Sequence, residues 1–393
     1  MVCEKRKESM HNFETDKIEL YIENDYIKSL ETNIGADNGI GVSYMLTILD
    51  SNNLKHPNLE MIFTSEEETV MGGAKNINLS NIKSKKMISL DAFSEEIINI
   101  GCASCSEKKI SYNNERKIID ELDNVYKIEL KGFLGGHSGN DICKKRGNPI
   151  IELTRFLQEL KDVRIIEYSG GAAVNSIPRD VITIISTKDK IDNNKLVKFE
   201  ENLKSIYGKN ITIKCEETNK SKFAYDISDT KKIFNFILEF PNGELLTKEN
   251  LNTVLSANLG KIYISDNKLN IEISIRSNLE SEFIEIGNKI EGLLLKNNFK
   301  VEINDIYEGY SQSENTQFIS FLIQKYKEIF LKDPIVKEEH FLLECSYFSK
   351  KITDLEYVSI SPNIYNPHSP DEMVSISSIQ RVWKYVRKIL QEI

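Results

Sequence analysis

The stretch between Thr32 and Val42 constrains the fold more than any other part of the chain. It reads Thr-Asn-Ile-Gly-Ala-Asp-Asn-Gly-Ile-Gly-Val, and a mostly apolar run continues to Leu49. Glycine permits positive φ and close backbone approach, so we expect Asp37 on a tight, partly buried turn that opens a helix over 38–50. An ordinary helix N-cap is the alternative role for Asp37. The glycine spacing, G-x-x-x-G-x-G, is not that of a dinucleotide-binding loop.

Composition bounds the class of protein. The 393 residues are 40% hydrophobic and 28% charged, which indicates a globular chain of two domains. The net charge of -9, with acids and bases interspersed, argues against a nucleic-acid partner. No apolar run approaches the ~20 residues of a membrane helix. The first residues lack the apolar region of a signal peptide, so we expect a cytoplasmic protein with no membrane partner.

The six cysteines carry little information. Cys102 and Cys105 form a single C-x-x-C without a second pair or a nearby histidine, which is a weak signal for zinc or redox chemistry. In a cytoplasmic protein, reduced thiols are the default.

The first hundred residues have an α/β pattern. A helix over 38–50 is followed by apolar segments at 59–64, 86–90 and 97–100 that predict strands. Strands alternating with helices indicate a mostly parallel sheet with covered faces. Asp37, the pair Glu67-Glu68, and Asp91 each stand where a strand gives way to a loop or helix. In open α/β sheets, ligands bind at that edge.

The middle of the chain differs in character. Residues 125–131 alternate like a half-exposed antiparallel strand, and two rounds of strands and helices then follow. We expect two α+β units, back to back, over 106–305. The α/β pattern returns afterwards, with a helix at 314–330, a strand at 356–360 and a closing helix at 377–393. The predicted α/β domain is therefore residues 1–105 and 306–393.

The acidic positions suggest hydrolysis by two metal ions. Two divalent ions ~3.5–4 Å apart need a bridging carboxylate, further carboxylate and imidazole ligands, and a base for the shared water. Asp37 suits the bridge, Glu68 and Asp91 suit terminal ligands, and His368, in a loop flanked by prolines, suits the imidazole. Glu67 suits the base. Each of these residues also has an ordinary alternative role. The acidic triplet 66–68 could be the solvated start of a helix, Asp91 could cap a turn, and His368 could have no role at all.

Ten short motifs, in one order from Met1 to the C-terminus, resemble the aminoacyl-histidine (Xaa-His) dipeptidases, cytosolic di-zinc peptidases related to carnosinases. The resemblance implies a zinc-binding α/β domain interrupted by an α+β lid domain, a small peptide as substrate, and a possible homodimer. The motifs are Met1-Val-Cys-Glu-Lys, Gly35-Ala-Asp-Asn-Gly-Ile-Gly, Glu67-Glu68, Leu90-Asp91, Ile100-Gly-Cys-Ala103, Gly135-Gly-His-Ser-Gly139, Asn175-Ser-Ile-Pro-Arg179, Pro241-Asn-Gly243, Ile275-Arg-Ser277 and Pro367-His-Ser-Pro-Asp-Glu372.

The resemblance also implies roles for individual residues. Asp37 would bridge the metals, Glu68 and His368 would complete one site, Asp91 would belong to the other, and Glu67 would be the general base.

Three further roles fall on the lid. His137 would polarise the scissile carbonyl, because an imidazole donor stabilises a developing oxyanion. Asn175 and Arg276 would grip the polar groups and the carboxylate of the peptide. For Arg276 alone, a surface ion pair is the commoner role.

Two departures from the family pattern set limits on these expectations. The family has a His-x-Asp pair just before Met-Val, whereas this sequence starts at Met1, so we expect an N-terminally truncated catalytic domain and one zinc ion instead of two. His340 or Glu95 is a conceivable substitute ligand. The family's His-Ala-Gly-Leu-Glu-Cys-Gly is here His340-Phe-Leu-Leu-Glu-Cys-Ser346.

The alternatives to a metallo-dipeptidase are an impaired relative that binds peptide or one metal ion, and an N-acyl amino acid deacylase.

Overall fold

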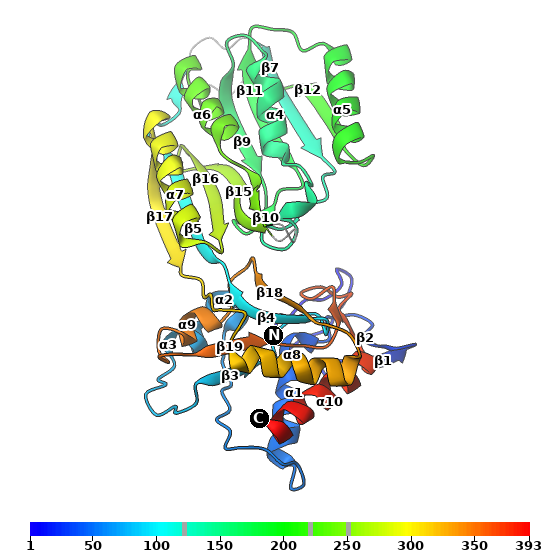
Figure 1. The fold of residues 1–393 in the computed structure, drawn as a ribbon. Coiled ribbons are helices and arrows are strands. Elements are labelled where there is room, and N and C mark those ends of the chain that lie inside the picture. The colour runs from blue at the N-terminus through cyan, green and yellow to red at the C-terminus, as the bar shows by residue number, and fades with distance from the viewer. Residues whose placement is uncertain (120–123, 219–222, 249–252) are drawn as a thin grey trace. The chain divides into compact units, whose positions relative to one another are not determined.

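The computed structural model describes residues 1–119, 124–218, 223–248 and 253–393, and the chain forms two compact units (Figure 1). Unit 1 consists of residues 1–102, 310–339 and 343–393. Unit 2 consists of residues 103–309 together with the three residues 340–342.

A four-stranded sheet forms the centre of unit 1. Its order is β18 (Ile335–Glu339), β4 (Ile97–Cys102), β19 (Glu356–Ser359) and β3 (Lys86–Ser89). The outer pairs, β18 with β4 and β19 with β3, are parallel, whereas β19 and β4 are antiparallel. The strands predicted at 86–90, 97–100 and 356–360 are confirmed.

Helices pack on this sheet. They are α1 (Ala36–Asp50), α8 (Gln317–Phe330) and α10 (Ile376–Glu392). Buried side chains of all three helices and of β4 and β19 share one hydrophobic core, including Ile48, Leu322 and Val386. The predicted helices at 38–50, 314–330 and 377–393 are thus confirmed, with shifts of up to three residues at their ends.

A second sheet and three short helices complete unit 1. The sheet is antiparallel, in the order β1 (Leu20–Glu23), β2 (Tyr26–Ser29), β21 (Met373–Ser375) and β20 (Ile364–Tyr365). The helices are α2 (Glu67–Val70), α3 (Gly72–Asn76) and α9 (Cys345–Phe348). The strand expected at 59–64 is wrong: Leu59 and Met61 pack against the core, but these residues pair with no strand in the described structure. Apolar side chains favour packing, whereas a strand also needs a hydrogen-bonded neighbour.

Unit 2 contains one continuous antiparallel sheet of nine strands. Eight follow the order β12 (Thr212–Glu217), β7 (Asn124–Lys131), β11 (Val181–Thr187), β9 (Arg164–Gly170), β15 (Thr253–Ser265), β16 (Lys268–Ser277), β5 (Ser104–Tyr112) and β17 (Phe299–Tyr307), and β14 (Gly243–Thr247) pairs with β15. The two predicted α+β units share this one sheet, because β9 and β15 pair at Gly170 and Ile262 and join the two halves. β15 is one strand with a shift of its register to β16 between Leu259 and Lys261.

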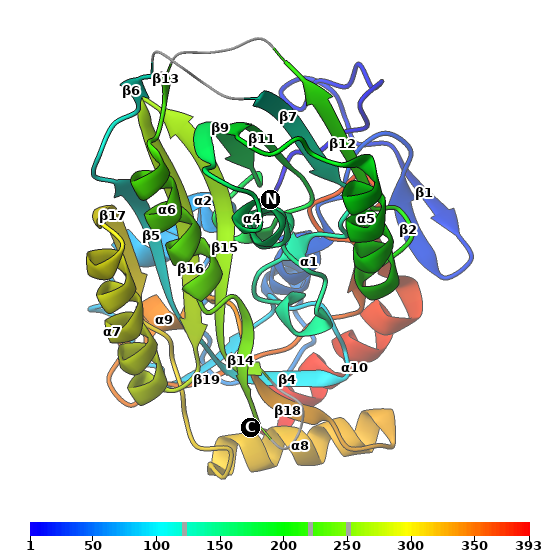
Figure 2. The same cartoon turned by 90° about the horizontal axis from the view of Figure 1, so that it is seen from above.

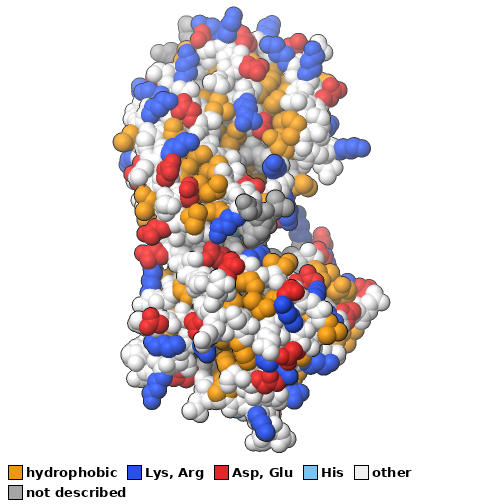
Figure 3. Space-filling view, in the orientation of Figure 1, with side chains coloured by type: hydrophobic (Ala, Val, Ile, Leu, Met, Phe, Trp, Pro, Cys, Tyr) orange, Lys and Arg blue, Asp and Glu red, His pale blue; other side chains and the backbone are white. Residues whose placement is uncertain are grey.

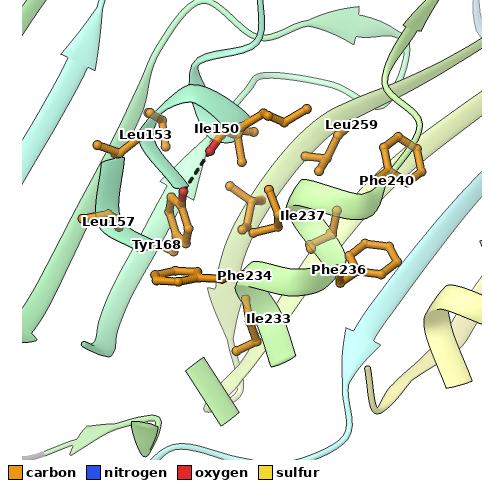
Figure 4. Close-up of a cluster of buried hydrophobic side chains, with 14 of the residues drawn as sticks. Ile150, Leu153, Leu157, Tyr168, Ile233, Phe234, Phe236, Ile237, Phe240 and Leu259 are labelled. Atoms are coloured by element: carbon orange, nitrogen blue, oxygen red, sulfur yellow. Dashed lines mark hydrogen bonds between the residues drawn. The ribbon is translucent and has the colours of Figure 1, made fainter. Parts of the chain in front are cut away.

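Four helices lie against this sheet (Figures 1 and 2): α4 (Pro149–Gln158), α5 (Asn193–Tyr207), α6 (Ile227–Glu239) and α7 (Glu280–Lys296). Their buried side chains and those of the strands form the largest described core. Figure 4 shows side chains of α4 and α6 around Tyr168, whose hydroxyl donates to the carbonyl of Ile150 at 3.1 Å.

Local sequence explains where several helices begin. The side chains of Asp192, Asp226, Thr316 and Ser375 each accept a hydrogen bond from a backbone N–H in the first turn of α5, α6, α8 and α10. These residues are favoured N-caps because they satisfy N–H groups that have no partner within the helix.

Short elements connect the rest of unit 2. They are β6 (Lys117–Ile118), β8 (Gly136–His137), β10 (Ser176–Ile177), β13 (Phe223–Ala224) and a 3-10 turn, η1 (Ile142–Lys144). β8 pairs with β10, and β6 pairs with β13. Figure 3 shows acidic and basic side chains interspersed on the visible face.

Candidate metal centre

The start of α1 places Asp37. The N-cap is Gly35, whose φ of 68° is the left-handed conformation that glycine tolerates best. Asp37 itself is not helical, with φ -89° and ψ 102°. The side chain that caps the first turn is that of Asn38, whose Oδ1 accepts the N–H of Gly41 at 3.0 Å. The alternative of a simple N-cap is therefore wrong, and the Asp37 carboxylate is available for another role. Asp37 is 8% exposed.

Glu372, the last residue of the motif Pro367–Glu372, holds this turn. Its carboxylate accepts hydrogen bonds from the backbone N–H groups of Ile34 at 2.9 Å, Gly35 at 2.8 Å and Asp37 at 3.1 Å. Glu372 is 1% exposed. A buried carboxylate that receives three N–H donors fixes the backbone of Asp37. Only its place in the motif Pro367–Glu372 signalled it in the sequence.

Asp37, Glu68 and His368 converge. His368 Nε2 lies 2.9 Å from Asp37 Oδ2 and 3.0 Å from Glu68 Oε2. One ligand atom from each residue lies within 4.8 Å of the other two. The pKa of His368 is raised to about 10, first by its hydrogen bonds to Asp37 and Glu68, so the metal-free imidazole is protonated at neutral pH. One imidazole and two carboxylates are a donor set that zinc accepts in catalytic sites, so the residues fit the ion.

Glu67 begins α2 beside this group. Its pKa is raised to about 7, first by burial and then by the negative charges of Glu68, Asp37 and Glu344, against a lowering effect of His368. A carboxyl whose pKa lies near neutrality suits general acid–base catalysis. Glu67 lies beside the predicted ligands and is not one of the three grouped ligand atoms.

Asp91 follows the end of β3 and adjoins Asp37. Burial raises its pKa well above the ordinary value, and the charges of Asp37 and Glu67 and a hydrogen bond with Asp37 add to this. Unit 1 thus brings together all five residues that the sequence predicts for the metal site and its base. Glu344, which no sequence pattern marked as a site residue, also acts electrostatically on Glu67 and Asp91.

The conceivable substitute ligands are engaged elsewhere. Glu95 accepts hydrogen bonds from Arg381 at 2.7 and 2.9 Å and from Asn363 at 3.0 Å. Both ring nitrogens of His340 bond to side chains of unit 2.

Cys102 and Cys105, the two cysteines of the C-x-x-C motif, do not pair with each other. Cys102 Sγ lies 3.5 Å from Cys345 Sγ, at the start of α9. Cys105 lies on β5, and all six cysteines are free thiols.

His137 and Asn175 lie on adjacent segments of unit 2. His137 in β8 pairs with Ser176 in β10, and the N–H of Ser138 donates to the carbonyl of Asn175 at 2.9 Å. The side-chain amide of Asn258 donates to the carbonyl of Ser176 at 2.9 Å. The loops that carry the two predicted residues are therefore fixed to each other and to β15.

Arg276 lies on β16, directly opposite Ser256 of β15. It is 4% exposed, and its Nε is buried without a hydrogen-bond partner among the described residues. The alternative of a surface ion pair is therefore wrong. Ser274, two residues earlier on the same face, lies 3.5 Å from Ser138 between hydroxyl oxygens. The sheet face that carries Arg276 thus also supports the His137 loop.

Known proteins match this architecture. The chain is 31% identical over 404 residues to the cytosol non-specific dipeptidase of Escherichia coli (strain K12), covering 100% of this chain and 83% of that protein. The crystal structure of aminoacylhistidine dipeptidase from Vibrio alginolyticus matches with a TM-score of 0.81 and 29% identity, over 100% of this chain and 82% of that one.

The model of the peptidase family M20/M25/M40 matches residues 35–392. The chain belongs to this family of metal-dependent hydrolases. No helix in the described residues is both long and apolar enough to cross a membrane.

Proposed function

We propose that the chain is a metal-dependent dipeptidase that hydrolyses Xaa-His dipeptides, with unit 1 as catalytic domain and unit 2 as lid domain. The observation that carries the proposal is the group formed by Asp37, Glu68 and His368, with the near-neutral carboxyl of Glu67 beside it. The printed names of the two relatives, a dipeptidase and an aminoacylhistidine dipeptidase, support the substrate class. The cytosolic relative supports a cytoplasmic location.

In this proposal Asp37, Glu68 and His368 would hold zinc, which would supply Lewis-acid activation of a water molecule. Glu67 takes the proton of the attacking water at its carboxylate. It then returns the proton to the nitrogen of the leaving amino acid, so that the amine departs neutral. Asp91, beside Asp37, would be the ligand available for a second ion.

The lid residues act on the substrate. His137 donates a hydrogen bond from its imidazole to the carbonyl oxygen as negative charge develops there. Arg276 offers its guanidinium to the carboxylate of the dipeptide, and its buried, unpartnered Nε supports this role, since a buried donor without a partner is costly. Asn175 binds polar groups of the peptide.

A substrate comparison tests the function. The zinc-loaded chain is assayed on Xaa-His dipeptides, on other dipeptides and on N-acetylated amino acids. We expect release of histidine from the Xaa-His dipeptides and at least tenfold slower hydrolysis of the acetylated amino acids. The reverse preference would establish a deacylase. Peptide binding without any turnover would establish the impaired relative.

A further inference from the structure

His340 occupies an unusual place in the chain. With Phe341 and Leu342 it belongs to unit 2, although the residues before and after this segment belong to unit 1. The His340 side chain is buried, with 8% of the residue exposed. Its Nε2 lies 2.8 Å from Ser256 Oγ, and its Nδ1 lies 2.9 Å from Asn278 Oδ1.

These two contacts define the proton positions on the ring. Asn278 Oδ1 can only accept, so Nδ1 carries the hydrogen and Nε2 accepts the proton of the Ser256 hydroxyl. Burial, together with the nearby positive charge of Arg276, lowers the pKa of His340 to about 3, so the ring is neutral at physiological pH. A neutral imidazole with one donor and one acceptor in use has no capacity left for a metal ion.

Both partners of His340 flank Arg276. Ser256 lies directly opposite Arg276 in the ladder between β15 and β16, and Asn278 comes two residues after Arg276 in the chain. The Ser256 side chain, which is bonded to His340, therefore lies on the sheet face that carries Arg276. Arg276 is itself buried, with an unpartnered Nε.

The same segment also contacts the His137 loop. The ring of Phe341 lies edge-on to the ring of His137, with 6.3 Å between centroids. A Cβ atom placed on Gly139 would lie only 3.0 Å from the carbonyl oxygen of His340. The backbone of His340 therefore packs closely against Gly139 in the His137 loop. Residues 340 and 341 therefore contact the His137 loop, and His340 also bonds to the two residues that flank Arg276. The proposed function gives roles to both His137 and Arg276.

We propose that His340 is a positioning residue that, through Ser256 and Asn278, fixes Arg276 to receive the terminal carboxylate of the dipeptide. The proposal rests on the proposed function. A long arginine side chain loses rotamer freedom when it binds an anion, and neighbours that fix it beforehand lower that cost. His340 touches neither the substrate nor the reacting atoms, so its effect is on recognition of the carboxylate.

The test compares binding of two ligands that differ only at the carboxylate. The full chain carrying Glu67→Gln, loaded with zinc, is titrated calorimetrically with Ala-His and with the C-terminal amide of Ala-His. The parent is expected to prefer the carboxylate by 10- to 100-fold, the range of a charge-assisted hydrogen bond. His340→Phe, which keeps a ring without polar atoms, is expected to reduce the preference at least fivefold. His340→Gln, which keeps a donor and an acceptor, is expected to restore part of it.

Two controls separate positioning from a general structural defect. The zinc content and the affinity for the amide are expected to be unchanged in His340→Phe, and His56→Phe, at an exposed histidine of unit 1, is expected to behave as the parent. Ser256→Ala combined with His340→Phe is expected to lose no more than either alone, because the two residues act in one network.

The outcomes are distinguishable. An undiminished carboxylate preference in His340→Phe overturns the proposal, and so does loss of zinc from that variant. A parent that binds both ligands equally overturns the role of Arg276 and of His340, while the dipeptidase proposal still stands on hydrolysis. A parent that binds neither ligand overturns the dipeptidase function itself. If His340→Phe does not fold, the partial effect of His340→Gln and the effect of Ser256→Ala decide the question.

Discussion

At the scale of single residues, Glu67 is the group on which the proposed chemistry depends. Replacement by Gln preserves the shape but removes the ability to accept a proton. We expect Glu67→Gln to retain zinc and to lose at least 100-fold in kcat, the range of a lost general base. Metal analysis and steady-state kinetics of the same preparation measure both effects. Glu68→Gln is the matched comparison, because it is expected to lose zinc as well as turnover. Parent-like turnover by Glu67→Gln would mean that another group is the base.

His368 makes a separate prediction about pH. In the metal-free protein its pKa is raised to about 10 by Asp37 and Glu68, compared with about 6.5 in the unfolded chain. A raised pKa stabilises the folded protein fully below about pH 6.5, and this contribution is lost as the pH rises through about 10. With a chelator present, the stability difference between the parent and His368→Asn is therefore expected to shrink from pH 6 to pH 10. Denaturant titrations at several pH values measure it, and a difference that grows with pH would contradict the assignment.

At the scale of elements, Glu372 connects the segment before β21 with the start of α1. Its three backbone hydrogen bonds fix the turn that presents Asp37. Glu372→Gln replaces one acceptor oxygen by a donor that faces N–H groups, so we expect a loss of about 1–3 kcal/mol in the free energy of unfolding. Retention of zinc is also expected to fall.

Asp371→Asn is the control, because Asp371 is exposed and pairs with Arg6 at the surface. Chemical denaturation and metal analysis of both variants are the measurements. Equal stability of Glu372→Gln and the parent would show that Glu372 does not hold the turn.

The sequence predicted elements best where local pattern was sufficient. The helix after Asp37 and the strand before Asp91 follow from an apolar run with clear boundaries, and both are present. The strand at 59–64 was wrong, because pairing with a neighbour cannot be read from apolar content. The role of Glu372 was not visible either, since its three partners lie more than 330 residues away in the chain. The convergence of Asp37, Glu68 and His368 was predicted from motif order, and only coordinates could supply their distances.

At the scale of the whole molecule, the two units divide the proposed work. Unit 1 carries the five acidic and imidazole side chains of the predicted metal site, and unit 2 carries His137, Asn175 and Arg276. In the described residues, the only group of three or more side chains close enough to share one ion is Asp37, Glu68 and His368. A second ion would have Asp37 and Asp91 from this chain. Oxygen ligands alone hold zinc less well than a site that includes nitrogen.

The zinc content of the 393-residue chain after exhaustive dialysis tests the central claim most directly. We predict close to one zinc ion per chain, and loss of that ion in His368→Ala. Asp91→Ala is expected to keep it, because Asp91 is not one of the three grouped ligands. A chain that holds no zinc, or one whose zinc survives His368→Ala, would contradict the assignment of Asp37, Glu68 and His368 as the metal site. Two tightly held ions would contradict the single-site account.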